Sequence, residues 1–296
     1  MSEKNVLSSE LLNQIKQIKI FTKRLMKSSL SGDYLSAFKG SGLEFDQIRD
    51  YQLGDDVRFI DWNASAKKNK IMIKQHIEER DRTVILVVDV SASQNYSSKK
   101  ELKKEMISKV AAVLTFISSE NKDKVGAIFF SDKIEKWIPP ARGRVHVSRI
   151  LKNIFCLKPT SKKTNIQQAL NFLVGLKKRN SVVFFLSDWI DDIDAYSKIL
   201  KVASCEYDFV GIRFLDEKEK EFPNVGFIDM QDFETGQSFT IDTKKQKEIN
   251  LFFSKIYIEQ KELFQKYKID LLDLSVGKNF INPMINFFRQ RIRRQI

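Results

Sequence analysis

Apolar residues follow two different patterns in this chain after residue 82. Short runs of consecutive apolar residues alternate with longer stretches in which apolar residues recur every three or four positions. Consecutive runs are typical of parallel strands covered on both faces, whereas the spaced pattern is typical of helices with one buried face. We expect strands at 83–88, 125–130, 134–138, 182–186, 207–214 and 269–274, and helices at 99–120, 145–155, 166–178, 192–202 and 244–267, followed by a basic terminal helix.

This alternation of strands and helices predicts an α/β fold with a doubly wound, mostly parallel sheet of the Rossmann-like kind. One interruption of the pattern is expected. The segments 227–230 and 238–241 flank Glu234-Thr235-Gly236, a turn sequence, and should pair as a hairpin.

The first 80 residues follow neither pattern for long. Apolar residues from Leu11 to Leu25 recur at helical spacing with lysines largely on the other side, which predicts a basic amphipathic helix that packs on the core or on a partner. Residues 32–74 show little periodicity and predict a long ordered loop with short strands. The expected divisions are a helix-and-loop extension over 1–80, the sheet domain over 81–275 and a basic C-terminal helix over 276–296.

Composition and charge exclude only a few classes of function. Hydrophobic residues make up 42% and charged residues 30%, which excludes a disordered chain. Lys and Arg number 51 against 38 Asp and Glu, a net charge of +13 that would suit nucleic acid, an anionic membrane or an acidic partner protein. No basic block with interleaved aromatic residues occurs, so solvated lysine-rich faces are favoured and no nucleic-acid partner is expected.

Cysteine use and hydropathy bear on the compartment. Cys156 and Cys205 stand in apolar surroundings without a metal-binding spacing, which predicts small buried side chains in a reducing compartment. No signal-peptide pattern is present, and no apolar run approaches the roughly 18 residues of a membrane span. We therefore expect a cytoplasmic protein without a transmembrane segment.

Candidate chemistry gathers where the predicted strands end. Asp89, Ser91 and Ser93 follow the first buried strand, Thr164 precedes a helix, and Asp188 follows another buried strand. Ligands of open parallel sheets bind at this carboxyl edge, and an oxygen-only set suits a hard cation such as Mg²⁺, or Mn²⁺, bound weakly. The alternative is that the three hydroxyls are helix N-caps and that Asp188 is an ordinary loop carboxylate.

This Asp-x-Ser-x-Ser sequence, with Thr164 and Asp188, resembles the metal-ion-dependent adhesion site of von Willebrand factor A domains. The resemblance implies that Ser91, Ser93 and Thr164 contact the metal directly or through water, and that Asp89 and Asp188 help to hold it. It also implies an open coordination position for an acidic group of a partner protein.

A second block lies upstream, between Gly42 and Trp62. It contains Gly54-Asp55-Asp56 followed by Arg58, and then Ile60-Asp61-Trp62. This block resembles the signature of domain-of-unknown-function family fifty-eight (DUF58), although Asp50 stands where that family usually has Glu. The resemblance continues through 141–144 and 232–236, and implies work beside a MoxR-type AAA+ ATPase in assembling or activating other proteins.

The residues of this block also have an interpretation of their own. Asp55, Asp56, Arg58 and Asp61 alternate in charge, and an arginine between carboxylates can lock a loop in place. Aromatic residues would anchor the loop on apolar surface; they are Tyr51, Phe59 and Trp62. Whether the block from Glu44 to Trp62 is structural or a contact surface stays open.

These observations predict a metal-dependent interaction adaptor rather than an enzyme, because no general base stands near a nucleophile and no cofactor motif occurs. It would join the ATPase and a client protein through an acidic residue on the metal. One alternative is a hydrolase with Asp89 and Asp188 around Mg²⁺, for which the cluster Asp191, Asp192 and Asp194 is the available second carboxylate set, unless those residues start a helix. The other alternative is a nucleic-acid binder driven by the net charge.

Overall fold

A computed structural model of the chain describes residues 34, 37, 44–52, 55–77, 82–95, 102–178, 181–216, 225–231 and 238–295. Contacts divide the chain into two compact units, a small one over Phe38–Arg82 and a large one to which Tyr34, Ala37 and Thr83–Ile296 belong. Unlike the expected divisions at 80 and 275, these units group Tyr34, Ala37 and the C-terminal helix with the sheet. The helix predicted between Leu11 and Leu25 lies outside the described residues.

The large unit is built on a six-stranded sheet of order β10-β7-β6-β3-β4-β5. Neighbouring strands are parallel except β4 and β5, which are antiparallel. The doubly wound, mostly parallel sheet predicted from the apolar runs is therefore confirmed. The strands are β3 (Thr83–Asp89), β4 (Lys124–Phe130), β5 (Ile134–Ala141), β6 (Val182–Ser187), β7 (Asp208–Leu215) and β10 (Asp270–Ser275).

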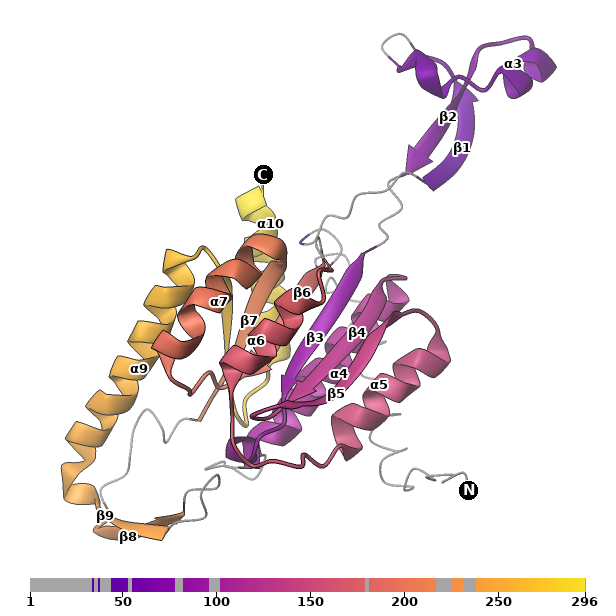
Figure 1. Cartoon of the computed structure of the whole chain (residues 1–296). Coiled ribbons are helices and arrows are strands. Elements are labelled where there is room, and N and C mark those ends of the chain that lie inside the picture. The colour runs from indigo at the N-terminus through magenta and orange to yellow at the C-terminus, as the bar shows by residue number, and fades with distance from the viewer. Residues whose placement is uncertain are drawn as a thin grey trace, which may run out of the picture. The chain divides into compact units, whose positions relative to one another are not determined.

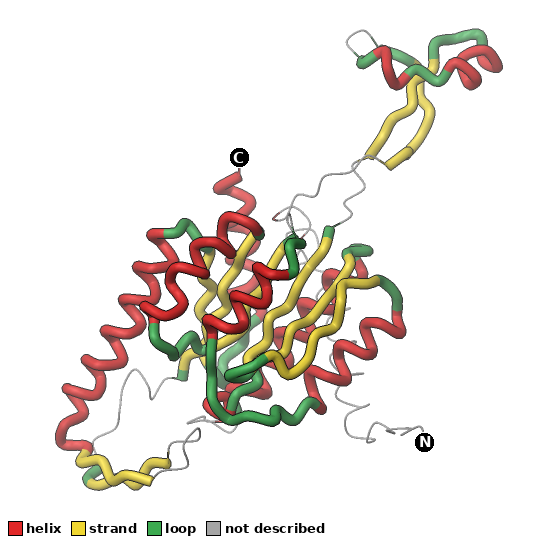
Figure 2. Tube along the Cα trace, in the orientation of Figure 1, coloured by secondary structure: helices red, strands yellow, loops and turns green. Residues whose placement is uncertain are grey.

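Helices cover both faces of this sheet (Figures 1 and 2). On one face, Ile85, Val87 and Phe185 pack in a common core with residues of α6, α7 and α9. The helices are α4 (Lys103–Glu120), α5 (Arg144–Cys156), α6 (Ile166–Gly175), α7 (Ile193–Glu206), α9 (Gln246–Lys266) and α10 (Ile281–Gln295), with a short 3₁₀ helix η2 (Ala92–Asn95) after β3. Because successive strand residues point to opposite faces, the intervening apolar residues face the second layer of helices.

Tyr34 belongs to that second layer although it precedes the sheet in sequence. Its hydroxyl lies 3.0 Å from Ser118 Oγ of α4 and donates to Asp123 at 3.2 Å. Its fully buried ring packs edge-on against Phe288 of α10 and stacks on Phe184 of β6. One side chain thus joins α4, α10 and the sheet.

The small unit contains more regular structure than the sequence predicts. Strands β1 (Glu44–Asp50) and β2 (Met72–Ile77) pair antiparallel, and η1 (Val57–Phe59) and α3 (Trp62–Lys68) lie between them. The short strands are confirmed, but the expected loop also contains a helix. α3 buries no residue and so has no apolar periodicity. Asp61 starts it by accepting hydrogen bonds from the backbone of Asn63 and Ala64, both at 3.0 Å.

Arg49 pairs with Asp55, one of the carboxylates of this unit. Arg49 donates two hydrogen bonds to Asp55, at 2.7 and 2.8 Å, and the Gln52 backbone donates a third at 2.8 Å. These bonds hold the pKa of Asp55 below its ordinary value. The side chain of Arg58 lies outside the described residues, and Trp62 is 71% exposed.

The sequence also led to expectations about a hairpin, the two cysteines and membrane-spanning helices. Strands β8 (Phe227–Gln231) and β9 (Ser238–Asp242) form the predicted antiparallel hairpin, and η3 (Thr243–Lys245) leads into α9. The prediction of buried cysteines is wrong, because Cys156 is half-buried and Cys205 exposed; both are free thiols. Among the described residues, no helix combines the length and the hydropathy of a membrane span.

Gly211 of β7 leads to a test of how α9 packs on the sheet. A Cβ atom at Gly211 would lie 2.4 Å from the Phe264 ring of α9, too close for any contact between heavy atoms. Gly211→Ala should therefore lower the free energy of unfolding of the large unit by about 1–3 kcal/mol, measured by urea denaturation.

Gly175 is the matched control, because a Cβ atom at that position meets nothing within 4 Å. Gly175→Ala should leave the stability unchanged or raise it by up to about 1 kcal/mol. Equal unfolding midpoints for the two variants would contradict the close packing of α9.

Candidate metal site at the carboxyl edge of the sheet

The two predicted carboxylates lie at the ends of adjacent strands. Asp89 ends β3 and Asp188 follows β6, and these strands pair with Val88 beside Leu186. From β3 the chain continues to β4 on one side, whereas from β6 it continues to β7 on the other. The pair therefore stands at the switch point of the sheet, where loops diverge and leave room for a ligand.

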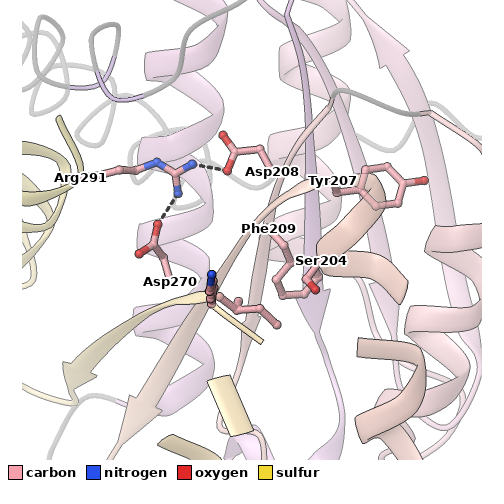
Figure 3. A pocket seen from close by; sticks show the side chains of 8 residues that line it. Ser204, Tyr207, Asp208, Phe209, Asp270 and Arg291 are labelled. Carbon is pink, nitrogen blue, oxygen red and sulfur yellow. Dashed lines mark hydrogen bonds and ion pairs between the residues drawn. The ribbon is translucent and has the colours of Figure 1, made fainter. Parts of the chain in front are cut away.

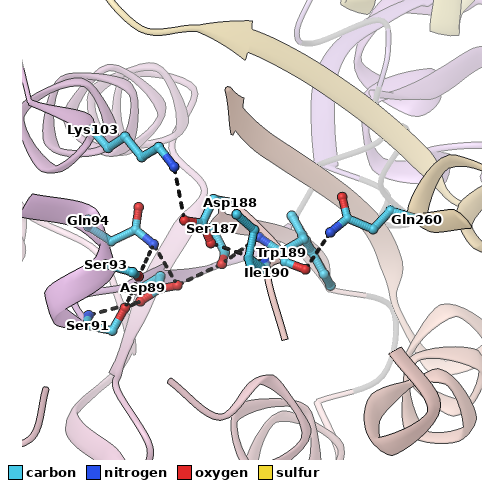
Figure 4. Close-up of polar contacts among 10 residues, drawn as sticks. All are labelled: Asp89, Ser91, Ser93, Gln94, Lys103, Ser187, Asp188, Trp189, Ile190 and Gln260. Carbon is cyan, nitrogen blue, oxygen red and sulfur yellow. Dashed lines mark hydrogen bonds and ion pairs between the residues drawn. The ribbon is translucent and has the colours of Figure 1, made fainter. Parts of the chain in front are cut away.

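Asp89 is buried and accepts hydrogen bonds on both oxygens (Figure 4). Its Oδ1 accepts from the backbone and the hydroxyl of Ser91 at 2.9 and 2.6 Å, and its Oδ2 accepts from Gln94 at 3.1 Å and Ser187 at 2.7 Å. Burial and the charge of Asp188 raise the pKa of Asp89 to about 7, although the hydrogen bonds from Ser91 and Ser187 lower it.

The two serine hydroxyls converge beside this carboxylate. Ser91 Oγ and Ser93 Oγ lie 2.9 Å apart, and Gln94 Nε2 donates to Ser93 at 3.1 Å. Ser91 is 1% exposed, whereas Ser93 is half-buried, so the accessible side of the site is that of Ser93.

The alternative interpretation makes the hydroxyls of the site helix N-caps, but other residues stand at the N-caps of α4 and α6. The N-cap of α4 is Leu102, and the N-cap of α6 is Asn165, whose side chain accepts from the Gln168 backbone at 2.8 Å. Thr164 precedes that cap and Ser91 donates its hydroxyl to Asp89, so neither acts as the N-cap of these helices.

Thr164 lies in a loop that is bound to the Asp89 loop through the backbone. Ala92 donates to the carbonyl of Lys162 at 2.9 Å, and Asn165 donates to the carbonyl of Ser131 at 3.0 Å. Thr164 itself is half-buried. The structure therefore brings the loop of Thr164 beside Ser91 and Ser93, as expected from the sequence.

Lys103, which the sequence analysis missed, pairs with the second carboxylate. Lys103 Nζ lies 3.3 Å from Asp188 Oδ2, and both side chains are 2% exposed. Asp188 Oδ1 accepts from the Ile190 backbone at 3.3 Å. A lysine in the first turn of a helix is disfavoured by the helix dipole, and the carboxylate of Asp188 offsets that charge.

Trp189 also lay outside the predicted site. It is fully buried and has a φ of 62°, a left-handed conformation that is strained for a bulky residue. Its backbone carbonyl accepts from Gln260 of α9 at 2.6 Å, and its backbone N–H donates to Ser187 Oγ at 3.1 Å. Its ring packs edge-on against Phe264. The turn that positions Asp188 is thus held by α9.

The acidic cluster after Asp188 starts helices. Asp191 accepts from the Ile166 backbone at 2.8 Å, at the start of α6, and Asp192 caps α7 by accepting from Asp194 at 3.0 Å. The interpretation of these residues as helix-start residues is confirmed. Among the residues that the structure describes, no group of three or more His, Cys, Asp and Glu side chains could hold a metal.

The donor chemistry nevertheless suits a hard divalent cation. The oxygens of Asp89, Ser91 and Ser93 form a continuous cluster, which is the ligand type that Mg²⁺ and Mn²⁺ prefer. Gln94 faces this cluster with its Nε2 donor, whereas its buried Oε1, which has no hydrogen-bond partner in the described part of the chain, points away from Asp89 (Figure 4). Asp188 fits less well, because Lys103 already holds one of its oxygens.

A small cavity of about 130 Å³ lies at the opposite, amino edge of the sheet (Figure 3). There Arg291 of α10 pairs with Asp208 and with Asp270 Oδ2, the latter at 2.6 Å, and donates to the carbonyl of Ala37 at 3.1 Å. These charges satisfy one another, so this edge has a structural role.

A family model described as a protein of unknown function, DUF58, matches residues 47–262. The chain belongs to the DUF58 family. Uncharacterized protein Rv1480 of Mycobacterium tuberculosis is 25% identical to this DUF58 protein over 288 residues, which are 96% of this chain and 90% of the relative.

Among solved structures, the conserved hypothetical protein BatB from Bacteroides thetaiotaomicron is similar to this DUF58 protein with a TM-score of 0.50 and 14% identity, over 72% of this chain and 99% of BatB. The SpRpn10 VWA domain matches at a TM-score of 0.41 and 9% identity, over 69% of this chain and 94% of that domain. The DUF58 protein therefore has an α/β fold, in which a mostly parallel six-stranded sheet is covered by helices.

Glu135 fixes the loop that carries Thr164. Its carboxylate accepts from Ser131 Oγ at 2.7 Å, from the Thr160 backbone and hydroxyl, and from the Ser161 backbone at 3.1 Å. Burial raises the pKa of Glu135, but these hydrogen bonds together outweigh burial and bring the pKa below its ordinary value.

The stability that Glu135 provides should depend on pH. Because its folded pKa lies below the unfolded value of about 4.3, the ionised carboxylate stabilises the fold above that pH, and the stabilisation is lost as the pH falls through the folded pKa. Glu135→Gln should lower the free energy of unfolding by about 1–2 kcal/mol at pH 7 and by much less near pH 3. Urea denaturation at several pH values measures this difference.

Glu262→Gln, on an exposed position of α9, serves as the control and should show little difference from wild type at any pH. A loss in Glu135→Gln that stays constant from pH 7 to pH 3 would show that the charge of Glu135 does not hold the loop.

Proposed function

We propose that this DUF58 protein is a metal-dependent protein-interaction module. In this proposal the carboxyl edge of the sheet takes a Mg²⁺ or Mn²⁺ ion, which accepts an acidic side chain of a partner protein. The observation that supports it is the convergence of the Asp89, Ser91 and Ser93 oxygens at the switch point, next to the loop of Thr164.

Each group of the site has a distinct part in this function. Ser91, Ser93 and Thr164 would hold the cation, with Asp89 and Asp188 supplying negative charge behind them. Asp89 orients Ser91 through two hydrogen bonds and thereby fixes the hydroxyl on which the site depends. The bound ion supplies a Lewis-acidic position for one carboxylate oxygen.

The half-buried residues decide where a partner enters. Asp89, Ser91 and Asp188 are each no more than 2% exposed, so a partner side chain would approach past Ser93 and Thr164. The net charge of +13 would speed encounter with an acidic surface at low salt.

For the partner we propose a MoxR-type AAA+ ATPase, with an adaptor role in assembling or activating a client protein, as the family resemblance implies. The hydrolase alternative has lost support, because its second carboxylate set would consist of Asp191, Asp192 and Asp194. Asp191 instead accepts from the backbone at the start of α6, and Asp192 caps α7. The nucleic-acid alternative still rests on net charge alone.

Metal binding is tested on the two half-buried hydroxyls, whose removal disturbs the core least. Ser93→Ala and Thr164→Ala should each weaken Mg²⁺ binding in isothermal titration by about tenfold, because each loses one oxygen ligand. Ser204→Ala, at the amino edge of the sheet, is the matched control and should bind Mg²⁺ as wild type does. Unchanged affinity in both site variants would remove the metal from the proposal.

Partner binding is tested by capture of a purified MoxR-type ATPase. EDTA and Thr164→Ala should each abolish most of the capture, and Mg²⁺ should restore it after EDTA for wild type alone. A complex that survives EDTA would place the interaction surface elsewhere.

A further inference from the structure

Lys103 brings a positive charge into a site built from oxygen acceptors (Figure 4). Its side chain is 2% exposed, and its Nζ lies 3.3 Å from the equally buried Asp188. A buried ammonium is stable only when it is paired, and the start of a helix offers it no compensation. The charge of Lys103 and that of Asp188 are therefore held in place by each other.

We propose that Lys103 is a built-in cation that competes with divalent metal for Asp188. Without metal, the ammonium neutralises the carboxylate and keeps the loop after β6 in position. Metal binding then has to overcome the Lys103–Asp188 pair, which keeps the affinity for metal low and its exchange fast. This inference rests on the proposed function, since it concerns the same cation site.

The competition also favours an acidic partner. Asp89, Asp188 and Lys103 formally carry one net negative charge, and a divalent cation changes that to one net positive charge. A single partner carboxylate would neutralise the loaded site. Without Lys103 the loaded site would already be neutral, and it would attract a carboxylate less strongly.

The test is Mg²⁺ binding to Lys103→Met. Removing the ammonium leaves Asp188 as a buried carboxylate that a divalent cation can neutralise. Isothermal titration should show Mg²⁺ binding tighter by about tenfold or more. Mg²⁺ should also raise the melting temperature of Lys103→Met by more than that of wild type, because binding to the folded state stabilises it.

Two control variants separate the pair from general charge effects. Lys103→Arg keeps the positive charge and should bind Mg²⁺ as wild type does. Lys104→Met removes one charge from the next residue of α4 and should also bind as wild type does. Should Lys103→Met not fold at any Mg²⁺ concentration, Lys103→Gln, which keeps a donor for Asp188, is measured instead.

The outcomes distinguish this inference from the proposed function. Tighter Mg²⁺ binding in the Lys103 variant alone supports the inference, and binding in that variant with none in wild type supports it while overturning metal-dependent function. Binding in wild type that does not tighten in the variant, or that tightens equally in Lys104→Met, overturns the inference and leaves the function standing. Absence of binding in both overturns both.

Discussion

Repulsion between two buried carboxylates is the constraint around which the carboxyl edge of this sheet is arranged. The pairing of β3 with β6 puts Asp89 and Asp188 side by side, and the fold compensates each in a different way. Asp89 receives hydrogen bonds from Ser91, Gln94 and Ser187, whereas Asp188 receives an ammonium from α4. The hydrogen-bond donors and the ammonium that compensate the two carboxylates therefore all lie in one small region. Loss of any one of them would leave a buried polar group without a partner.

Most of the sheet could be predicted because its four central strands, β3, β4, β6 and β7, are covered on both faces. All six positions of β6 are buried, for example, so its sequence is an uninterrupted apolar run ending at a serine. The short helix α3 could not be predicted in this way, because it buries no residue and its formation depends on the cap at Asp61.

The site was predictable to the extent that its residues follow directly from strand ends. Asp89, Ser91, Ser93 and Asp188 are adjacent to apolar runs, and topology alone brings those ends together. Lys103 and Gln260 could not be found in that way, because they contact Asp188 and Trp189 from helices 85 and 71 residues away in the chain. Their residue types are common on exposed helix surfaces, so only the tertiary contacts distinguish them. In the small unit, Arg49 pairs with Asp55 from six residues away, a contact that the sequence analysis did not single out.

The contact between Arg291 and the Ala37 carbonyl spans 254 residues of chain. It sits beside the ion pairs with Asp208 and Asp270, and Tyr34 packs against Phe288 nearby in sequence. The sheet strands are therefore synthesised well before α10. Until then, Tyr34 and Ala37 lack their contacts with Phe288 and Arg291 of α10. The hairpin of the small unit, by contrast, contains its own contacts and can form during synthesis. The large unit therefore becomes complete only after α10 has been synthesised, so its folding has to wait for contacts between segments far apart in the chain.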